Sequence, residues 1–370
     1  MTSRLFSPIR LRHLELTNRL VVAPMCQYSA LDGCVSDWHT IHLGTMAMSG
    51  AGLLIVEATG VEPEGRISPG CPGLYSDDNE LAWKRVVDVC RRYGSAKIGI
   101  QLAHAGRKGS ASRPWEGGGS IPVGQPGAWQ TRSASPEPFA PGWQVPSSMS
   151  VDDLAALKAR FVEATVRADR VGFDLVELHS AHGYLMHQFL SPLSNTRNDD
   201  YGGSLENRMR FPLEVFEALR KVWPASKPLG VRISASDWVE GGWDLEQSIT
   251  FAKALEMHGC DFIDVSSGGN VHDAKIPMGP KYQVPFAAAI RKAVRMPVMT
   301  VGLIVEPEEA EEILVSGEAD MVALARGFLD DPRWGWHAAY RLGGTAQIPP
   351  QYARAGAELW RPAARYKAKS

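Results

Sequence analysis

Hydrophobic residues along the 370-residue chain gather into short continuous runs, and these alternate with longer stretches in which apolar residues recur at helical spacing. A continuous apolar run predicts a strand with both faces buried, as in a parallel sheet. Eight such runs occur, at residues 19–25, 52–59, 97–106, 173–182, 229–236, 261–269, 297–303 and 319–327. The pattern therefore predicts eight parallel strands that alternate with helices.

Two of the predicted helices carry start signals. Ser150 precedes an apolar stripe that begins near Val151, and Ser204 follows a Tyr-Gly-Gly turn. A serine at this position accepts a hydrogen bond from a free backbone N–H of the first helical turn. Residues 108–149 differ, because they are rich in Gly, Pro, Ser and Trp and have no period. They predict a long loop after the third strand, which is either a lid or substrate wall or a solvated flap.

Two architectures alternate strands and helices in this way, an open doubly wound sheet and a closed barrel. No G-x-G-x-x-G motif follows the first run, which disfavours the dinucleotide-binding form of the open sheet. Polar residues and glycines at the ends of the runs favour the barrel. We therefore expect an α/β fold, a single-domain (β/α)8 TIM barrel over residues 1–345. Residues 1–17 are expected to cover its bottom, and residues 346–370 to form a tail outside it.

Composition and charge narrow the class of protein. With 44% hydrophobic and 22% charged residues, the chain suits a globular protein with a large core. A formal net charge of −2 without a long basic run disfavours nucleic acid as a partner. No apolar stretch approaches a membrane span or a signal peptide. The five cysteines form no C-x-x-C pair, which favours reduced thiols over disulfides or structural zinc. We expect a cytoplasmic enzyme that binds a small molecule.

In a barrel of this kind the loops after the strands meet at one face, where the chemistry gathers. The loops after the last two strands often hold a phosphate group, and here they offer glycine backbone and an arginine. A phosphate-bearing ligand is therefore expected. The residues at the ends of the runs are Pro24, Met25, Cys26, Gln27, Tyr28, Glu57, Ala58, Gln101, His104, His179, His182, Tyr184, Arg232, Gly302, Ala325 and Arg326.

The segment HSAHGYL, residues 179–185, presents two imidazoles and a phenol at the end of the fourth run. A zinc site needs three or four ligands, and beyond His179 and His182 the sequence offers only Cys26, so we expect no metal. Histidines that are satisfied within the core are an alternative. Paired imidazole N–H groups also suit a substrate oxygen on which negative charge develops, and the phenol of Tyr184 suits donation of a proton to a carbanion.

Several motifs together carry a family resemblance: APMCQY, EATGV, IQLAHAGR, HSAHGYL, SNTRNDDYGGSLENRMRF and ALARGFLDDP. From about Leu5 to Tyr352 the chain resembles, in order and spacing, the Old Yellow Enzyme family of FMN-dependent ene-reductases. The cysteine in PMCQY and the His-x-x-His pair are similar to the thermophilic-like subclass, close to the xenobiotic reductases. The resemblance implies a barrel that binds FMN, takes hydride from NADPH and passes it to the β carbon of α,β-unsaturated carbonyl or nitro compounds.

The resemblance also implies roles for single residues. His179 and His182 would bind the activating oxygen of the substrate, and Tyr184 would protonate its α carbon. Cys26 would lie beside the flavin and tune its potential, although a small buried thiol is the plainer interpretation. Tyr28 would line the substrate pocket. The implied FMN contacts are Pro24, Met25, Cys26, Ala58, Gln101, His179, Arg232, Gly302, Ala325 and Arg326. Arg232 would stabilise the anionic reduced flavin, with pairing to a carboxylate as the alternative.

A segment near the C-terminus indicates the oligomeric state. Gln351, Tyr352 and Arg354 match a C-terminal segment that, in this subclass, reaches into the active site of the adjoining subunit. The resemblance therefore implies a homodimer or dimer-built tetramer in which Arg354 contacts substrate, and a solvated tail arginine is the alternative. Ala355 departs from the tryptophan that the xenobiotic reductases carry there.

Two rival functions are considered. Dienoyl-CoA reductase and trimethylamine dehydrogenase resemble this barrel but extend into an iron–sulfur region, and no cysteine cluster follows Cys260 here. A flavin-binding redox sensor would have no use for Tyr184 as a proton donor. We therefore expect the ene-reductase.

Overall fold

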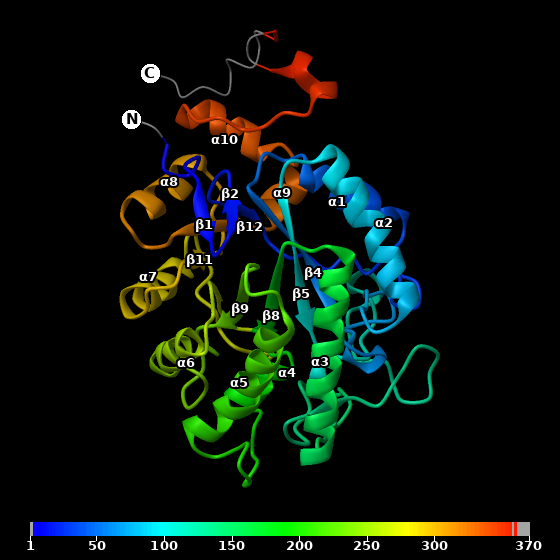
Figure 1. The fold of residues 1–370 in the computed structure, drawn as a ribbon. Helices are drawn as coiled ribbons and strands as arrows, with labels where there is room; N and C mark the ends of the chain where they lie inside the picture. The colour runs from blue at the N-terminus through cyan, green and yellow to red at the C-terminus, as the bar shows by residue number, and fades with distance from the viewer. Residues whose placement is uncertain (1–2, 357–358, 361–370) are drawn as a thin grey trace.

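Eight parallel strands close into a barrel in the computed structural model, which describes residues 3–356 and 359–360 (Figure 1). The strands follow one another around the barrel in chain order, and β12 pairs with β3 to close it. They are β3 (Leu20–Val22), β4 (Leu53–Gly60), β5 (Lys97–Ala103), β8 (Leu175–Ser180), β9 (Leu229–Ser234), β10 (Ile263–Ser266), β11 (Val298–Thr300) and β12 (Met321–Leu324). The predicted (β/α)8 barrel is confirmed.

Successive residues of a strand face opposite sides of the barrel wall, and both sides are buried. In β3, Val21 packs in the interior cluster, whereas Leu20 and Val22 pack in the larger cluster between wall and helices. Because neither face meets water, the strands need no polar alternation, which explains the continuous apolar runs. Other strands contribute Leu53, Ile55, Leu175, Phe262, Met299, Met321 and Ala323 to the interior cluster.

Helices cover the outside of the barrel (Figure 1). Both predicted N-caps are confirmed: Ser150 Oγ accepts from the Asp153 N–H, and Ser204 Oγ accepts from the Asn207 N–H. No helix of the described chain is both long and apolar enough to cross a membrane. The helices are α1 (Asp37–Ala47), α2 (Asp77–Tyr93), α3 (Val151–Val171), α4 (Leu185–Leu190), α5 (Leu205–Val222), α6 (Leu245–Met257), α7 (Val284–Ala293), α8 (Pro307–Val315), α9 (Arg326–Asp330) and α10 (Trp334–Leu342).

A hairpin of β1 (Ile9–Leu11) and β2 (Leu14–Leu16) covers the amino end of the barrel. Leu11 and Leu16 join the interior cluster, so they close the barrel from below. Glu311 of α8 fixes the start of the chain, because its carboxylate accepts hydrogen bonds from Ser3 Oγ and from the Leu5 N–H. The described part of residues 1–17 thus covers the bottom, as predicted.

The segment after β5 is a long loop, as predicted, and its base is fixed to the barrel. Arg197 donates to the backbone oxygens of Ala134 and Met149, and Trp129 Nε1 donates to Glu64 O. The tip, residues 115–127, is largely exposed. The loop contains η2 (Gly106–Lys108), η3 (Pro114–Glu116), β6 (Arg132–Ser133) and β7 (Ser147–Ser148).

Beyond α10 the chain continues into the short turn η4 (Pro350–Ala355). The guanidinium of Arg333 lies 4.2 Å from the ring centroid of Trp336 and 4.3 Å from that of Tyr352, so it contacts both rings. This contact fixes η4 against α10. Arg354, in the same turn, is exposed.

Candidate active site

Three rings from the end of β8 converge at the carboxyl end of the barrel. His179 lies on β8, His182 lies in the following turn, and Tyr184 immediately precedes α4. The ring centroid of His179 lies 5.3 Å from that of His182 and 5.0 Å from that of Tyr184, and both ring pairs meet edge to face. His179 is buried, whereas His182 and Tyr184 are partly exposed.

Hydrogen bonding determines which ring nitrogen of His179 carries the proton and can donate it to a ligand. The Ala181 N–H donates to His179 Nδ1 over 3.2 Å, so the neutral ring carries its proton on Nε2. Burial, followed by the charges of Arg232 and Lys108, holds the pKa of His179 well below its ordinary value. His179 is therefore a neutral donor through Nε2–H.

His182 lies in a tight turn that needs the glycine after it. Its backbone has a φ of 59°, its N–H donates to Ser234 Oγ over 2.9 Å, and its Nε2 lies 2.8 Å from Ser266 Oγ. Burial and Arg232 also hold the pKa of His182 well below its ordinary value. At Gly183 the φ is 70°, and a Cβ there would lie 2.3 Å from Gly269 O. The contact with Ser266 leaves Nδ1 of His182 for a ligand.

The phenol of Tyr184 keeps its proton at neutral pH. Burial raises the pKa of Tyr184 well above its ordinary value, and the neighbouring Cys26 and Tyr28 add to the effect. Such a phenol gives up its proton only to a strong base, such as a carbanion. Among the groups gathered here, Tyr184 is suited to the role of an acid.

The residues that follow β3 leave the ladder and are partly exposed at the same face. The Gln27 N–H donates to Glu57 Oε2 over 2.9 Å, which fixes this segment to β4. Tyr28 packs edge to face on Trp115 of the long loop, with ring centroids 5.9 Å apart. The loop thus contributes a wall beside Tyr28.

Cys26 is a protonated thiol in this environment. A hydrogen bond with Cys71, followed by burial, raises the pKa of Cys26 well above its ordinary value. A thiol of this kind is a weak S–H donor and a poor nucleophile, which fits tuning of a neighbouring group. Cys71 was not predicted at the site, because the segment PGCPG around it shows only a turn signal.

Polar side chains occupy the barrel interior below the rings. Gln101 Nε2 donates to Glu177 Oε1 over 2.8 Å, and Arg232 Nε lies 3.1 Å from Asp264 Oδ2. Glu177 Oε2 has no hydrogen-bond partner among the described residues. Burial and the nearby Asp264 raise the pKa of Glu177 to about 8. Two carboxyl groups share one guanidinium here, and the cluster therefore keeps one proton at neutral pH, on Glu177.

Sequence reasoning predicted Gln101 and Arg232 at the site but missed Glu177 and Asp264. Both acids stand inside apolar runs, DLVEL and DFIDV, and an acid within a buried strand is the signal that could have revealed them. Arg232 does pair with a carboxylate, the alternative considered above, and it also lines the cavity described next.

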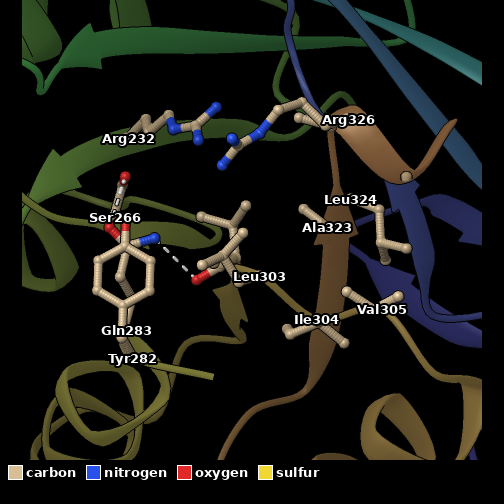
Figure 2. A pocket seen from close by; sticks show the side chains of 14 residues that line it. Arg232, Ser266, Tyr282, Gln283, Leu303, Ile304, Val305, Ala323, Leu324 and Arg326 are labelled. Carbon is tan, nitrogen blue, oxygen red and sulfur yellow. Dashed lines mark hydrogen bonds between the residues drawn. The ribbon is translucent and has the colours of Figure 1, made fainter. Parts of the chain in front are cut away.

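A cavity opens at the ends of β10, β11 and β12 (Figure 2). Arg232 and Arg326 point toward one another across it. Arg326 is exposed and forms no ion pair with any described residue. Two guanidinium groups that face one cavity repel each other unless an anion lies between them. The cavity therefore fits a phosphate-bearing cofactor such as FMN.

Gln283 fixes the glycine backbone in this cavity. Its Nε2 donates to Val301 O over 2.9 Å, and its Oε1 accepts from Ser267 Oγ over 2.7 Å. Gly302 follows with a φ of 128°, and a Cβ there would lie 2.6 Å from Gln283 Nε2. Gln283 and its neighbour Tyr282 lie in the loop after β10 and match no motif, so sequence reasoning missed them.

The residues predicted from the strand ends lie at one face of the barrel. Arg354, which was predicted from the C-terminal segment instead, does not lie among them. That arginine belongs to η4, which packs on α10. No group of three or more His, Cys, Asp or Glu side chains within the described residues could hold a metal ion. The predicted FMN contacts lie at or just after the carboxyl ends of the strands. They are Pro24, Met25, Cys26, Ala58, Gln101, His179, Arg232, Gly302, Ala325 and Arg326.

Fold and site together define a (β/α)8-barrel enzyme whose ligands bind at the carboxyl ends of the strands. Residues 4–343 match the NADH:flavin oxidoreductase / NADH oxidase family. The chain is 44% identical over 356 residues to the NADPH dehydrogenase of Geobacillus thermodenitrificans, which covers 96% of this chain and 99% of that protein.

The similar solved structures include two reductases. Morphinone reductase has a TM-score of 0.78 and 28% identity, over 95% of this chain and 93% of its own. 2-Naphthoyl-CoA reductase has a TM-score of 0.81 at 24% identity, which shows the fold alone, and the chain spans 52% of that longer protein.

The chain belongs to the NADH:flavin oxidoreductase / NADH oxidase family. It is an oxidoreductase whose cofactor is the flavin FMN. The predictions of an Old Yellow Enzyme-like family and of an enzyme rather than a sensor are confirmed.

Proposed function

We propose that the protein is an FMN-dependent NADPH:ene-reductase that reduces the activated C=C bond of α,β-unsaturated carbonyl or nitro compounds. The grouping of His179, His182 and Tyr184 carries the proposal, because it offers two neutral imidazoles for one oxygen and one phenol for one carbon. FMN, when bound, supplies the transfer of hydride from the nicotinamide to the substrate. The remaining steps fall to the side chains of the protein.

The imidazoles act on the substrate oxygen. Nε2–H of His179 would donate to a carbonyl or nitro oxygen at the open face of the barrel, and His182 would do the same through Nδ1–H in the tautomer whose Nε2 accepts from the Ser266 hydroxyl. A fixed donor stabilises an oxygen more strongly as that oxygen gains negative charge, which occurs when hydride adds to the β carbon. The low pKa values of both rings keep them neutral, so they orient and polarise the substrate without protonating it.

Tyr184 supplies the proton. Its raised pKa keeps the O–H intact until a carbanion develops at the α carbon of the substrate. Tyr28, partly exposed and packed on Trp115, would line the substrate pocket. Cys26, as a thiol, would tune the flavin beside it.

The cofactor would be held from several strands. Arg326 and the backbone of Gly302 would bind its phosphate, and Arg232 and Gln101 the pyrimidine edge of its ring. The two arginines that face one cavity support this arrangement. Backbone and small side chains would complete the contacts, namely Pro24, Met25, Ala58 and Ala325.

NADPH is proposed as the reductant, because the similar proteins from Geobacillus are named NADPH dehydrogenases. We also propose a homodimer or dimer-built tetramer in which Arg354 reaches the active site of the neighbouring subunit. In its own chain Arg354 is exposed on a turn that Arg333 holds in place, which supports this assembly.

Anaerobic half-reactions test the function. NADPH should bleach the flavin of the purified holoenzyme, and 2-cyclohexenone should restore its colour, whereas the saturated cyclohexanone should not. If neither enones nor nitroalkenes reoxidise a flavin that oxygen still reoxidises, the ene-reductase proposal is rejected and the family membership stands.

A further inference from the structure

Lys108 is a cation beside the candidate site that the proposed function does not use. It lies in η2, directly after β5, and its side chain is partly exposed. Its Nζ lies 5.0 Å from the ring centroid of Tyr184 and 4.5 Å from that of Phe139. The ammonium group therefore lies between an aromatic ring of the site and one of the long loop.

Two backbone carbonyls hold the ammonium group in place. Lys108 Nζ donates to His182 O over 2.8 Å and to Gly269 O over 2.7 Å. These oxygens belong to two tight turns, with φ values of 59° at His182 and 91° at Gly269. Lys108 thus joins the turn after β8, which carries His182 and leads to Tyr184, to the loop after β10.

The charge of Lys108 has no counter-ion within residues 3–356 and 359–360. It forms no ion pair there, and its chain neighbour Arg107 bonds to Asn270 and to backbone oxygens of the long loop. Burial, followed by the charge of Arg107, lowers the pKa of Lys108 to about 7. An ammonium group has three N–H donors, and two are used, so the ammonium form of Lys108 has one donor and its positive charge available to a ligand.

We propose that Lys108 determines substrate specificity, by offering its remaining N–H and its positive charge, beside the Tyr184 ring, to a carboxylate on a substrate whose carbonyl oxygen is held by His179 and His182. The preferred substrates are α,β-unsaturated carbonyl compounds that also bear a carboxylate. This inference rests on the proposed function, since it takes the two histidines as the oxygen-binding end of the pocket.

The charge of Lys108 makes the preference depend on pH. A carboxylate stabilises the ammonium form, so it binds most tightly below the pKa of Lys108 and loses this advantage as the pH rises through about 7. The groups that face Lys108 are Arg107, His179, His182, Tyr184, Phe139 and the two carbonyls, and none of these carries a negative charge that could take the place of the ligand.

Two matched phenols test the proposal in the FMN holoenzyme, since phenols resemble the polarised oxygen of the substrate. Dissociation constants of 4-hydroxybenzoate and 4-hydroxybenzamide are measured from the change in flavin absorbance. At about pH 6 the dissociation constant of the benzoate from the wild-type protein should be at least roughly tenfold lower than that of the benzamide. One additional charge-assisted hydrogen bond accounts for a difference of this size. At about pH 8 the difference should shrink to a few-fold or less.

Lys108→Met should remove the preference at both pH values and keep the binding of 4-hydroxybenzamide and the FMN content. Lys97→Met, at the exposed opposite end of β5, is the matched control and should behave as wild type. A preference that persists in Lys108→Met, or that does not change with pH in the wild-type protein, overturns the proposal. If Lys108→Met does not fold, the pH dependence of the two dissociation constants in the wild-type protein still tests the proposal. If neither phenol binds, it is the oxygen-binding role of the histidines that fails.

Discussion

At the scale of single residues, the site works through protonation states that are set by burial and, at Cys26, first by the hydrogen bond with Cys71. The two imidazoles are held neutral, the Tyr184 phenol and the Cys26 thiol keep their protons, and Glu177 holds a proton inside the barrel. Each of these groups has lost the water that would stabilise its charged form. Around the substrate oxygen the site therefore presents hydrogen-bond donors rather than charges.

Replacement of Tyr184 separates the two half-reactions. Tyr184→Phe should leave NADPH-driven bleaching of the flavin nearly unchanged and slow reoxidation by an enone, by roughly 10²–10⁴-fold if Tyr184 is the sole acid. Stopped-flow absorbance measures both rates, and Tyr93→Phe on the exposed face of α2 is the control. Enone turnover at the wild-type rate would mean that another group supplies the proton.

Glu177 predicts a pH dependence of stability. Its folded-state pKa of about 8 exceeds the ordinary value, so the folded protein binds the extra proton. The stability linked to this group is fully present below the unfolded pKa, near about 4.3, and is lost as pH rises through about 8. Between these limits the free energy of unfolding should fall by about 1.4 kcal/mol per pH unit relative to that of Glu177→Gln.

Urea unfolding from about pH 5 to about pH 8 measures this difference. Glu240→Gln, at an exposed position after β9, should follow the wild-type curve. Wild-type and Glu177→Gln curves that run parallel would show that Glu177 is ionised throughout. The comparison uses no substrate, so its result does not depend on the proposed enzymatic activity.

At the scale of elements, the ends of parallel strands place the functional groups. β8 and β9 are neighbours in register, with His179 opposite Arg232, and β5 pairs with β8, with Gln101 opposite Glu177. Residues that are about 50 to 80 positions apart in the sequence are thus adjacent across one ladder. The loops after β11 and β12 add Gly302 and Arg326 to the same face.

The start of α9 supplies a direct test of the cofactor site. Arg326→Ala should weaken retention of FMN, because it removes charge-assisted hydrogen bonds worth on the order of 1.5–3 kcal/mol each. Equilibrium dialysis of FMN against the apoprotein measures the change. Arg295→Ala, exposed before β11, should bind FMN as the wild type does. Equal affinity of Arg326→Ala would place the phosphate elsewhere.

At the scale of the whole molecule, the active site and the tail are separate features of one chain. The barrel presents its site at the carboxyl ends of the strands, whereas η4 packs on α10 through Arg333 and Tyr352. In the assembly proposed above, Arg354 would serve the active site of a neighbouring subunit.

Arg354→Ala should weaken substrate binding and leave the FMN content unchanged, and wild-type specific activity should fall when dilution dissociates the oligomer. Lys253→Ala on α6 is a surface-charge control. Light scattering and steady-state kinetics on the same samples check both. A monomer that is fully active at nanomolar dilution would exclude the role of Arg354 in a partner site.

The sequence by itself determined the barrel and most of its site. Eight apolar runs without polar alternation require strands buried on both faces, and strand-end residues must meet at one face once the barrel closes. The apolar runs are longer than the strands, however. The sequence predicted a strand over residues 19–25, whereas β3 spans only Leu20–Val22. Apolar character continues past the ladder into residues that line the site, so hydrophobicity marks burial better than it marks strand pairing.

Only the tertiary structure decided which polar groups face one another. Lys108 meets His182 and Gly269, and Glu177 meets Asp264 beside Arg232, through pairings between segments that are about 75 to 160 residues apart. No local pattern encodes such contacts, because they depend on register and on loop geometry. Protonation follows from them in turn, since a pKa is set by lost water and by neighbouring charges. The sequence named most of the groups of this site, whereas packing added Glu177, Asp264 and Gln283 to them and fixed the chemical states of all.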